Sequence, residues 1–126
     1  MTLRQLFSTK KIGDDAERIA ERFLIRHNLK LVARNYRCRY GEIDLIMRHD
    51  ETLTFVEVRL RKSLRGTADF GGALASITSL KQAKIIATAQ HYLAGMKHQP
   101  PCRFDVVLLN GLNVQDVEWI KSAFDA

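Results

Sequence analysis

The sequence predicts an α/β domain in which a mixed central sheet is flanked by helices, in the element order α-β-β-β-α-β. Two segments have the apolar spacing of amphipathic helices, one near the N-terminus and one in the second half of the chain. Three short runs of alternating, β-prone residues lie between them, and a further apolar run follows the second segment. The length of 126 residues fits one domain. We expect residues 1–13 to form a flexible basic arm and residues 14–126 to form a single domain.

The first helix is expected to begin at Asp14, an N-capping residue with Glu17 at the capping-box position. Asn28 is expected to end it. Its predicted buried stripe consists of Ala16, Ile19, Ala20, Phe23 and Leu24.

The remaining elements are predicted from the helical period of about 3.6 residues and the strand period of two residues. Strands are predicted over residues 31–37, 42–48 and 53–61, with a turn at 49–52. A glycine-containing loop is predicted over residues 62–73. A helix over 79–94, a strand over 103–109 and a short strand or closing element over 114–120 complete the domain. The second helix has a candidate buried stripe of Leu80, Ala83, Ile86, Ala87 and Leu93, and a polar face of Lys81, Lys84, Thr88 and His91.

The second and third predicted strands carry acidic residues at positions that meet across a hairpin. Alternation places Ile43, Leu45 and Met47 on one face of the second strand, and Glu42, Asp44, Ile46 and Arg48 on the other. A two- or four-residue turn centred between Asp50 and Glu51 sets Asp44 opposite Glu57, about 5 Å apart at Cβ. The same register sets Glu42 opposite Arg59. A three- or five-residue loop would shift this pairing.

Two carboxylates at this separation repel each other unless a cation lies between them. Mg²⁺, or Mn²⁺, is a candidate, because Mg²⁺ prefers oxygen ligands and is commonly bound by one or two carboxylates together with phosphate oxygens. Such an ion can polarise a phosphodiester and activate water. The alternative is a surface pair that is neutralised by Arg48, Arg59 or Arg61.

The charge distribution points to a polyanionic partner or to an ordinary basic surface. The net charge is +6, and residues 1–40 hold ten Lys or Arg against four Asp or Glu. We find no signal peptide and no apolar run of the length that a membrane span needs. Two cysteines, Cys38 and Cys102, are too few for a disulfide framework. These features favour a cytoplasmic protein with no membrane association.

Several motifs together resemble a known family. Gly41-Glu42-Ile43-Asp44-Leu45-Ile46 followed by Phe55-Val56-Glu57-Val58-Arg59 resembles the PD-(D/E)xK nuclease signature. The fuller set resembles the bacterial YraN family of uncharacterised proteins. It adds Gly13-x3-Glu17, Arg34-Asn35-Tyr36-Arg37, Phe70-Gly71-Gly72-Ala73 and Cys102-Arg103-Phe104-Asp105-Val106-Val107. The resemblance implies a restriction-endonuclease-like fold related to archaeal Holliday-junction resolvases.

The resemblance also implies roles for individual residues. Asp44 and Glu57 would be metal ligands, with the Val58 carbonyl as a third ligand. Glu17 would be the acidic residue that resolvase-like nucleases carry on their first helix, whereas the residues alone equally allow a capping-box glutamate. The chain departs from the signature at Arg59, which stands where the family motif has lysine. Arginine stays charged and is a poor general base, so a metal-bound hydroxide or Glu42 would take that role, while Arg59 could stabilise transition-state charge.

Basic residues near these motifs are candidate phosphate contacts, although a solvated surface explains any one of them equally simply. They are Arg34, Arg37, Arg39, Arg61, Lys62, Arg65, Lys81 and Lys84. Gln82 is a weaker candidate for a polar group near the site. Asp105, in an apolar strand, is predicted to be a buried structural residue rather than a ligand.

The sequence therefore predicts a Mg²⁺- or Mn²⁺-dependent endonuclease-like protein acting on DNA, with branched or recombination intermediates as candidate substrates. By analogy with resolvases it would be a homodimer. The rival hypothesis is a nucleic-acid-binding module that has kept the nuclease fold without catalysis. A protein that binds a partner and no nucleic acid is a third hypothesis.

Overall fold

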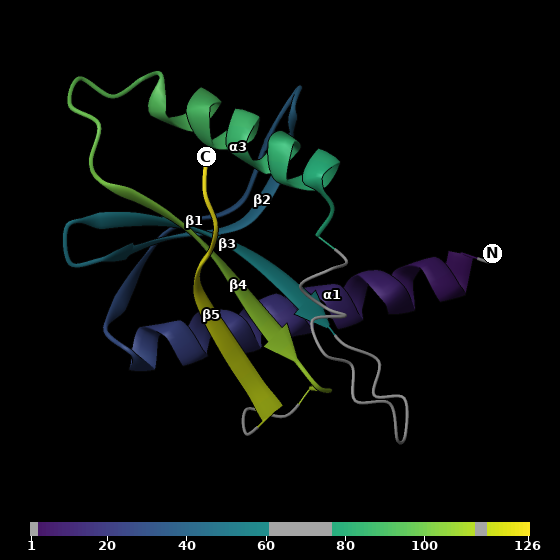
Figure 1. The fold of residues 1–126 in the computed structure, drawn as a ribbon. Coiled ribbons are helices and arrows are strands. Elements are labelled where there is room, and N and C mark those ends of the chain that lie inside the picture. The colour runs from purple at the N-terminus through teal and green to yellow at the C-terminus, as the bar shows by residue number, and fades with distance from the viewer. Residues whose placement is uncertain (1–2, 61–76, 113–115) are drawn as a thin grey trace.

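The computed structural model describes residues 3–60, 77–112 and 116–126 and contains one mixed sheet (Figure 1). The five strands lie in the order β1-β2-β3-β4-β5, with β3 parallel to β4 and the other neighbours antiparallel. The elements are α1 (Leu3–Arg26), β1 (Leu29–Cys38), β2 (Gly41–His49), β3 (Thr52–Leu60), α3 (Ser79–Leu93), β4 (Cys102–Leu109) and β5 (Val117–Phe124). The predicted mixed sheet with flanking helices is confirmed, and the fifth strand begins at Val117 rather than at residue 114.

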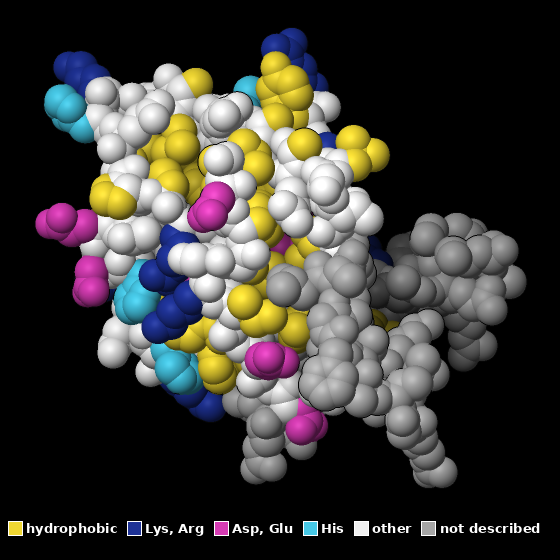
Figure 2. All heavy atoms as spheres, viewed as in Figure 1, with side chains coloured by type: hydrophobic (Ala, Val, Ile, Leu, Met, Phe, Trp, Pro, Cys, Tyr) yellow, Lys and Arg dark blue, Asp and Glu magenta, His cyan; other side chains and the backbone are white. Residues whose placement is uncertain are grey.

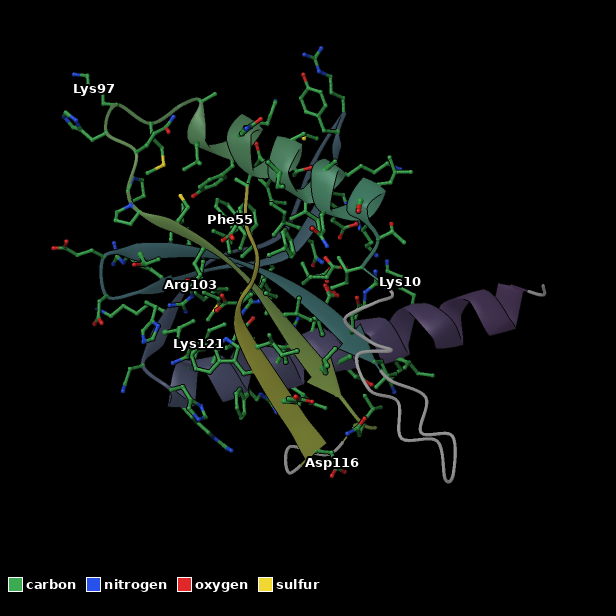
Figure 3. All side chains as sticks on the ribbon, viewed as in Figure 1. Lys10, Phe55, Lys97, Arg103, Asp116 and Lys121 are labelled. Carbon is green, nitrogen blue, oxygen red and sulfur yellow. The ribbon has the colours of Figure 1, made fainter. Side chains whose placement is uncertain are left out.

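The two helices cover opposite faces of the sheet and define two apolar layers (Figure 1). On the α1 side, Leu24 packs with Met47. On the α3 side, Ile85 packs with Phe55, which lies beneath that helix in Figure 3. Because both faces are covered, β3 is buried continuously from Leu53 to Glu57 instead of on alternate residues only.

The regular pleat of β1 and β2 is interrupted where the two strands approach the candidate site. Their ladder omits the pair Asn35 and Asp44, and Asn35 has a positive φ of 49°. Asparagine tolerates this left-handed conformation better than most residues. Ile43 consequently packs with Ile46 in the α3-side layer. The prediction that Ile43 shares a face with Leu45 is therefore wrong.

Helix α1 is longer at its N-terminus than expected. It begins at Leu3 instead of Asp14, so residues 3–13, predicted to be a flexible arm, are helical. A glycine inside a helix costs only about 1 kcal/mol relative to alanine, and the helix passes through Gly13. Glu17 is therefore an interior helical residue, and its capping-box interpretation is wrong. Asn28 follows the helix with a positive φ of 71°, as expected of the residue that ends it.

Helix α3 has the predicted extent but presents a different face to the sheet. Leu80, predicted to be buried, is 68% exposed, while Thr88, predicted to be on the polar face, is fully buried. The Thr88 hydroxyl donates a hydrogen bond to the Lys84 carbonyl (2.7 Å), which satisfies it in the interior. A Cβ at Gly41 would lie 3.2 Å from the Thr88 Oγ1, so glycine allows the start of β2 to pack closely on this helix.

Candidate metal centre

Asp44 lies where the pairing between β2 and β3 ends. The ladder runs from His49↔Thr52 to Leu45↔Val56, which confirms the predicted hairpin register. Asp44 and Glu57 are the next pair in this register and lie beyond the paired residues. The Asp44 carboxylate instead accepts a hydrogen bond from the Val58 backbone N–H (2.8 Å). A side chain thus takes the position that a β2 carbonyl would occupy in a continued ladder.

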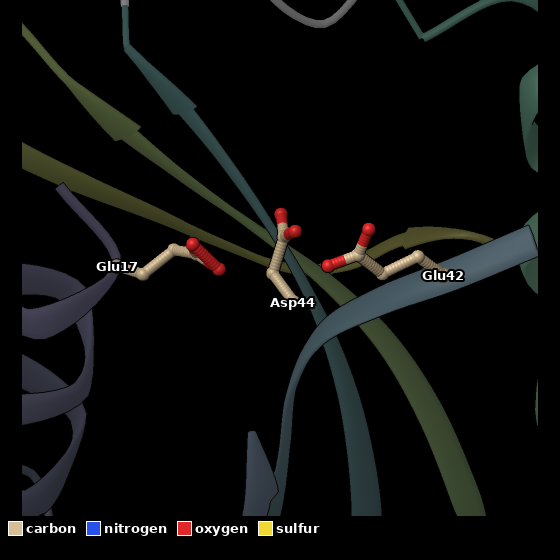
Figure 4. A group of neighbouring side chains, drawn as sticks. All are labelled: Glu17, Glu42 and Asp44. Atoms are coloured by element: carbon tan, nitrogen blue, oxygen red, sulfur yellow. The ribbon is translucent and has the colours of Figure 1, made fainter. Parts of the chain in front are cut away.

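Three carboxylates from two elements converge at this point. One oxygen from each of Glu17, Glu42 and Asp44 lies within 4.8 Å of the other two. Figure 4 shows Glu17 extending from α1 toward Asp44, with Glu42 on the opposite side. Oxygen atoms in this arrangement are the ligand type that Mg²⁺ and Mn²⁺ prefer. Asp44 and Glu17 were predicted for this site, whereas Glu42 was considered only as a base.

Asn35 connects two of these acids, and sequence reasoning named it within a family motif but gave it no role in the site. Its Nδ2 donates to Glu17 Oε1 (2.6 Å) and lies 3.2 Å from Glu42 Oε1. The positive φ that interrupts the ladder at Asn35 therefore occurs in the residue that bridges the acids. An asparagine within an otherwise β-prone run was the available signal.

The electrostatics of the site favour an added cation. Burial, followed by the negative charge of Glu57, raises the pKa of Asp44 to about 8, against the opposing hydrogen bond from Val58. Burial also raises the pKa of Glu17, partly offset by the Asn35 hydrogen bond and reinforced by Glu42. Both carboxyl groups thus hold protons more strongly than in water. A divalent cation would displace these protons and neutralise the cluster.

Glu57 has a different set of neighbours from the three clustered acids. Its side chain is nearly buried, with Oε1 3.3 Å from Lys81 Nζ and 3.6 Å from Arg59 Nε. Lys81 comes from α3 and Arg59 from β3 itself. The structure therefore brings Glu57 close enough to raise the pKa of Asp44 while pairing its own charge with two cations. The predicted ligand role of the Val58 carbonyl stays a prediction.

The predicted phosphate contacts are dispersed. Arg34 forms a two-pronged pair with Glu21, with Nη2 2.9 Å from Oε2. Arg37 Nε lies 3.4 Å from Glu42 Oε2. On the face shown in Figure 2, basic side chains of the described residues form separate groups rather than one continuous patch. Arg61, Lys62 and Arg65 lie outside the described residues.

Three further candidates have clear positions. Lys84 is exposed on α3. The Arg39 guanidinium lies 4.8 Å from the centre of the exposed Tyr40 ring, at the tip of the β1–β2 hairpin. Gln82 donates to the Ile77 carbonyl (3.1 Å), which is a local contact at the start of α3.

Asp105 has the structural role that was predicted for it. The residue is fully buried on β4. Its carboxylate accepts hydrogen bonds from Arg103 Nε (2.8 Å), Arg103 Nη2 (3.0 Å), Trp119 Nε1 (2.9 Å) and the Ser122 N–H (3.0 Å). These donors satisfy the charge without a metal ion.

Neither helix in the described parts of the chain is long and apolar enough to cross a membrane.

Comparisons with known proteins connect this chain to a family. The model of the uncharacterised protein family UPF0102 matches residues 16–109. This range includes the acids of the candidate site, which are Glu17, Glu42, Asp44 and Glu57. The chain is 57% identical to a UPF0102 protein of Nitrosomonas europaea over 113 residues, covering 90% of this chain and 92% of the relative.

Two other relatives extend the match across almost the whole chain. A UPF0102 protein of Methylobacillus flagellatus is 52% identical over 118 residues, covering 93% of this chain and 99% of the relative. One of Cupriavidus metallidurans is 50% identical over 126 residues, covering 99% of this chain and 89% of the relative. The expected membership in an uncharacterised bacterial family is thus confirmed, and the chain belongs to the UPF0102 family.

Proposed function

We propose that this chain is a divalent-cation-dependent endonuclease-like protein that hydrolyses phosphodiester bonds in DNA. The observation that carries the proposal is the convergence of Glu17, Glu42 and Asp44, whose carboxylate oxygens lie within 4.8 Å of one another. The buried Glu57 lies beside them, and its carboxylate pairs with the side chains of Arg59 and Lys81. The resemblance to the PD-(D/E)xK signature supports it, as does a hairpin followed by a parallel strand in a sheet between two helices. A restriction-endonuclease-like fold related to Holliday-junction resolvases is part of the proposal.

The residues of the cluster fit Mg²⁺ or Mn²⁺. Asp44 is half-buried, and its raised pKa indicates that no cationic side chain balances its charge. When bound, the ion would polarise the scissile phosphate and activate a water molecule. Glu17, Glu42 and Asp44 would hold it. Mg²⁺ typically leaves several coordination positions to water and phosphate oxygens, which is the arrangement that a phosphodiester substrate requires.

The remaining residues supply charge and proton transfer. Hydrolysis adds water across a P–O bond, giving a phosphate monoester and a hydroxyl group, and the attacking water must lose a proton. Arg59 stays protonated and is unsuited to accept it. Glu42 is the most exposed of the three clustered acids, and in this proposal its carboxylate oxygen that does not hold the ion accepts the proton. Arg59 instead balances the charge of Glu57 and so reduces the repulsion between the site and a phosphate.

The substrate and assembly form part of the same proposal. Branched DNA, including recombination intermediates, is the substrate class that the resolvase resemblance favours, and a homodimer would cut two strands symmetrically. Arg39 and Lys84 are proposed to contact phosphates, because both are exposed and neither has an acidic partner among the described residues, whereas Arg34 is paired with Glu21 and Arg37 with Glu42.

The decisive experiment combines metal binding with DNA cleavage. Mn²⁺ and Mg²⁺ would be titrated calorimetrically into the wild type, Asp44→Asn and Glu51→Gln, with cleavage of a four-way junction, a duplex and a single strand measured in parallel. Glu51 is an exposed acid in the β2–β3 turn and serves as the matched control. We expect Asp44→Asn to lose metal binding and cleavage, and Glu51→Gln to keep both. A wild type that binds neither metal and cuts none of these substrates would overturn the proposal.

A binding module without catalysis is the second candidate, and Arg59 is the observation that favours it. An arginine at the position of the signature lysine keeps the positive charge for phosphate binding and removes a proton acceptor. This candidate predicts DNA affinity that falls steeply with salt and does not change with EDTA or Mg²⁺. Affinity that requires the divalent ion would exclude it.

A further inference from the structure

Lys81 lies beside Glu57, although it belongs to helix α3 and not to the β2–β3 motif that resembles the nuclease signature. Helix α3 begins at Ser79, after an N-cap in which the Thr78 hydroxyl accepts the Lys81 N–H (3.2 Å). This cap fixes the first turn of the helix over the sheet. The Lys81 side chain then extends toward β3 and places Nζ 3.3 Å from Glu57 Oε1.

Arg59 approaches the same carboxylate from a more enclosed position. Its side chain is 28% exposed, compared with 38% for Lys81, and its Nε lies 3.6 Å from Glu57 Oε1. That Nε is buried and has no hydrogen-bond partner among the described residues. Arg59 is thus positioned mainly to balance the charge of Glu57, whereas the Lys81 ammonium is the more accessible of the two cations.

We propose that Lys81 is the catalytic lysine of this site, supplied by α3 in place of the strand position that Arg59 occupies. The inference rests on the proposed function. The ammonium group has three donors, and an ion pair with Glu57 uses one of them, which leaves two for a non-bridging oxygen of the scissile phosphate. It acts as a permanent point charge that stabilises the transition state, so the role requires no change in its protonation.

The competing interpretation is that Lys81 only fastens α3 to β3. A partly exposed ion pair contributes at most about 1 kcal/mol to stability, so in that case its loss would lower the melting temperature slightly and leave cleavage unchanged. Lys97 is the control, because it is an exposed lysine to which no role in the site is assigned. It follows the C-terminal end of α3, and Figure 3 shows it at the opposite end of that helix from its first turn.

The first test measures single-turnover cleavage by the wild type, Lys81→Gln and Lys97→Gln, with DNA affinity measured in Ca²⁺. We expect Lys81→Gln to cut about 10²- to 10³-fold more slowly with little change in affinity. We expect Lys97→Gln to match the wild type in both rate and affinity. An active wild type with an equally active Lys81→Gln variant would overturn the role of Lys81 and leave the proposed function standing.

The second test does not depend on activity. Reductive methylation of lysines in the wild type would be followed by mass spectrometry, with Ca²⁺ and with or without a short 5′-phosphorylated oligonucleotide. We expect the oligonucleotide to protect Lys81 and to leave Lys97 unprotected. Protection without cleavage of any DNA would support the phosphate contact but overturn the proposed hydrolysis. Absence of both would overturn both proposals, and cleavage without protection would overturn the contact alone.

Discussion

Asp44 and Asp105 are both strand aspartates, half-buried and fully buried respectively, yet their hydrogen-bond partners differ in almost every respect. Asp105 on β4 accepts four hydrogen bonds, two of them from the charged Arg103, which is labelled in Figure 3. Asp44 on β2 accepts one hydrogen bond, from Val58, and faces other acids. A complete donor set indicates a carboxylate that holds the fold together. A half-buried carboxylate among other carboxylates is what the proposed cation site requires.

The same contrast occurs within helix α1, one turn apart. Glu21 is paired through both carboxylate oxygens with Arg34, which lowers its pKa through hydrogen bonding, against the effect of burial. Glu17 has a neutral amide as its partner, and burial raises its pKa. The helix thus carries one neutralised acid and one acid that is available to a cation.

The largest effect is expected from removing the satisfied carboxylate. Asp105→Ala leaves the Arg103 guanidinium without its partner in a mostly buried position, so the free energy of unfolding should fall by about 3–5 kcal/mol. Urea denaturation measures this change. The control is Asp125→Ala, which removes an exposed C-terminal aspartate and should be nearly neutral. Equal stability of the two variants would show that the four donors around Asp105 contribute little.

Mn²⁺ should stabilise the folded protein through the cluster of Glu17, Glu42 and Asp44. At a Mn²⁺ concentration of one hundred times the dissociation constant, the wild type should gain about 2.7 kcal/mol, because the folded state alone presents the clustered acids. Asp44→Asn should gain almost nothing, and Glu51→Gln should respond as the wild type does. Thermal melts with and without EDTA measure the difference. A full response in Asp44→Asn would place the cation elsewhere.

The raised pKa of Asp44 should make the stability of the protein depend on pH. In EDTA, folded Asp44 keeps its proton up to a pKa of about 8, whereas in the unfolded chain it loses it near 3.8. The folded state therefore binds more protons between these values, and the free energy of unfolding falls as pH rises through that window. Asp44→Asn should flatten this slope and, near neutral pH, raise stability by about 1.4 kcal/mol or more. An unchanged slope would contradict the raised pKa.

The smallest effect is expected at Asn35. Asn35→Gly keeps the positive φ at no steric cost but removes the amide that contacts Glu17 and Glu42. Stability should change by about 0.5 kcal/mol or less. The pKa of Glu17 should rise further, since the lost hydrogen bond lowers it. A ¹³C titration of the carboxyl groups measures this shift, with Asn28→Gly as a control for the backbone. No shift would mean that the amide does not influence the acids.

Sequence reasoning predicted the hairpin register because local rules decide it. Asp50 in the β2–β3 turn has a positive φ of 54°, and the two-residue turn fixes every pair up to Leu45↔Val56. Amphipathic spacing likewise predicted the buried residues of α1, among them Ala16, Ala20 and Leu24. These predictions needed only residues that are near each other in the chain.

The parts that sequence reasoning missed depend on packing between distant segments. Alternation predicts a regular strand through Asp44, but the left-handed Asn35 breaks the pleat, and that choice becomes favourable only when the amide meets the acids of α1 and β2. Lys81 was predicted only as a phosphate contact. Its approach to Glu57 depends on how α3 lies over β3, which no local periodicity specifies.

The hydrogen bond between Val58 and Asp44 gives the site a built-in spectroscopic reporter. The Val58 amide lies on a central strand, yet its acceptor is a titrating carboxylate rather than a backbone carbonyl. Its ¹H–¹⁵N cross-peak should therefore move when the Asp44 proton is lost or replaced by a cation, while the neighbouring amides of β3 that pair with backbone stay nearly fixed. One assigned resonance of the ¹⁵N-labelled protein would follow the chemical state of the centre, without an attached probe, a substrate or a mutation.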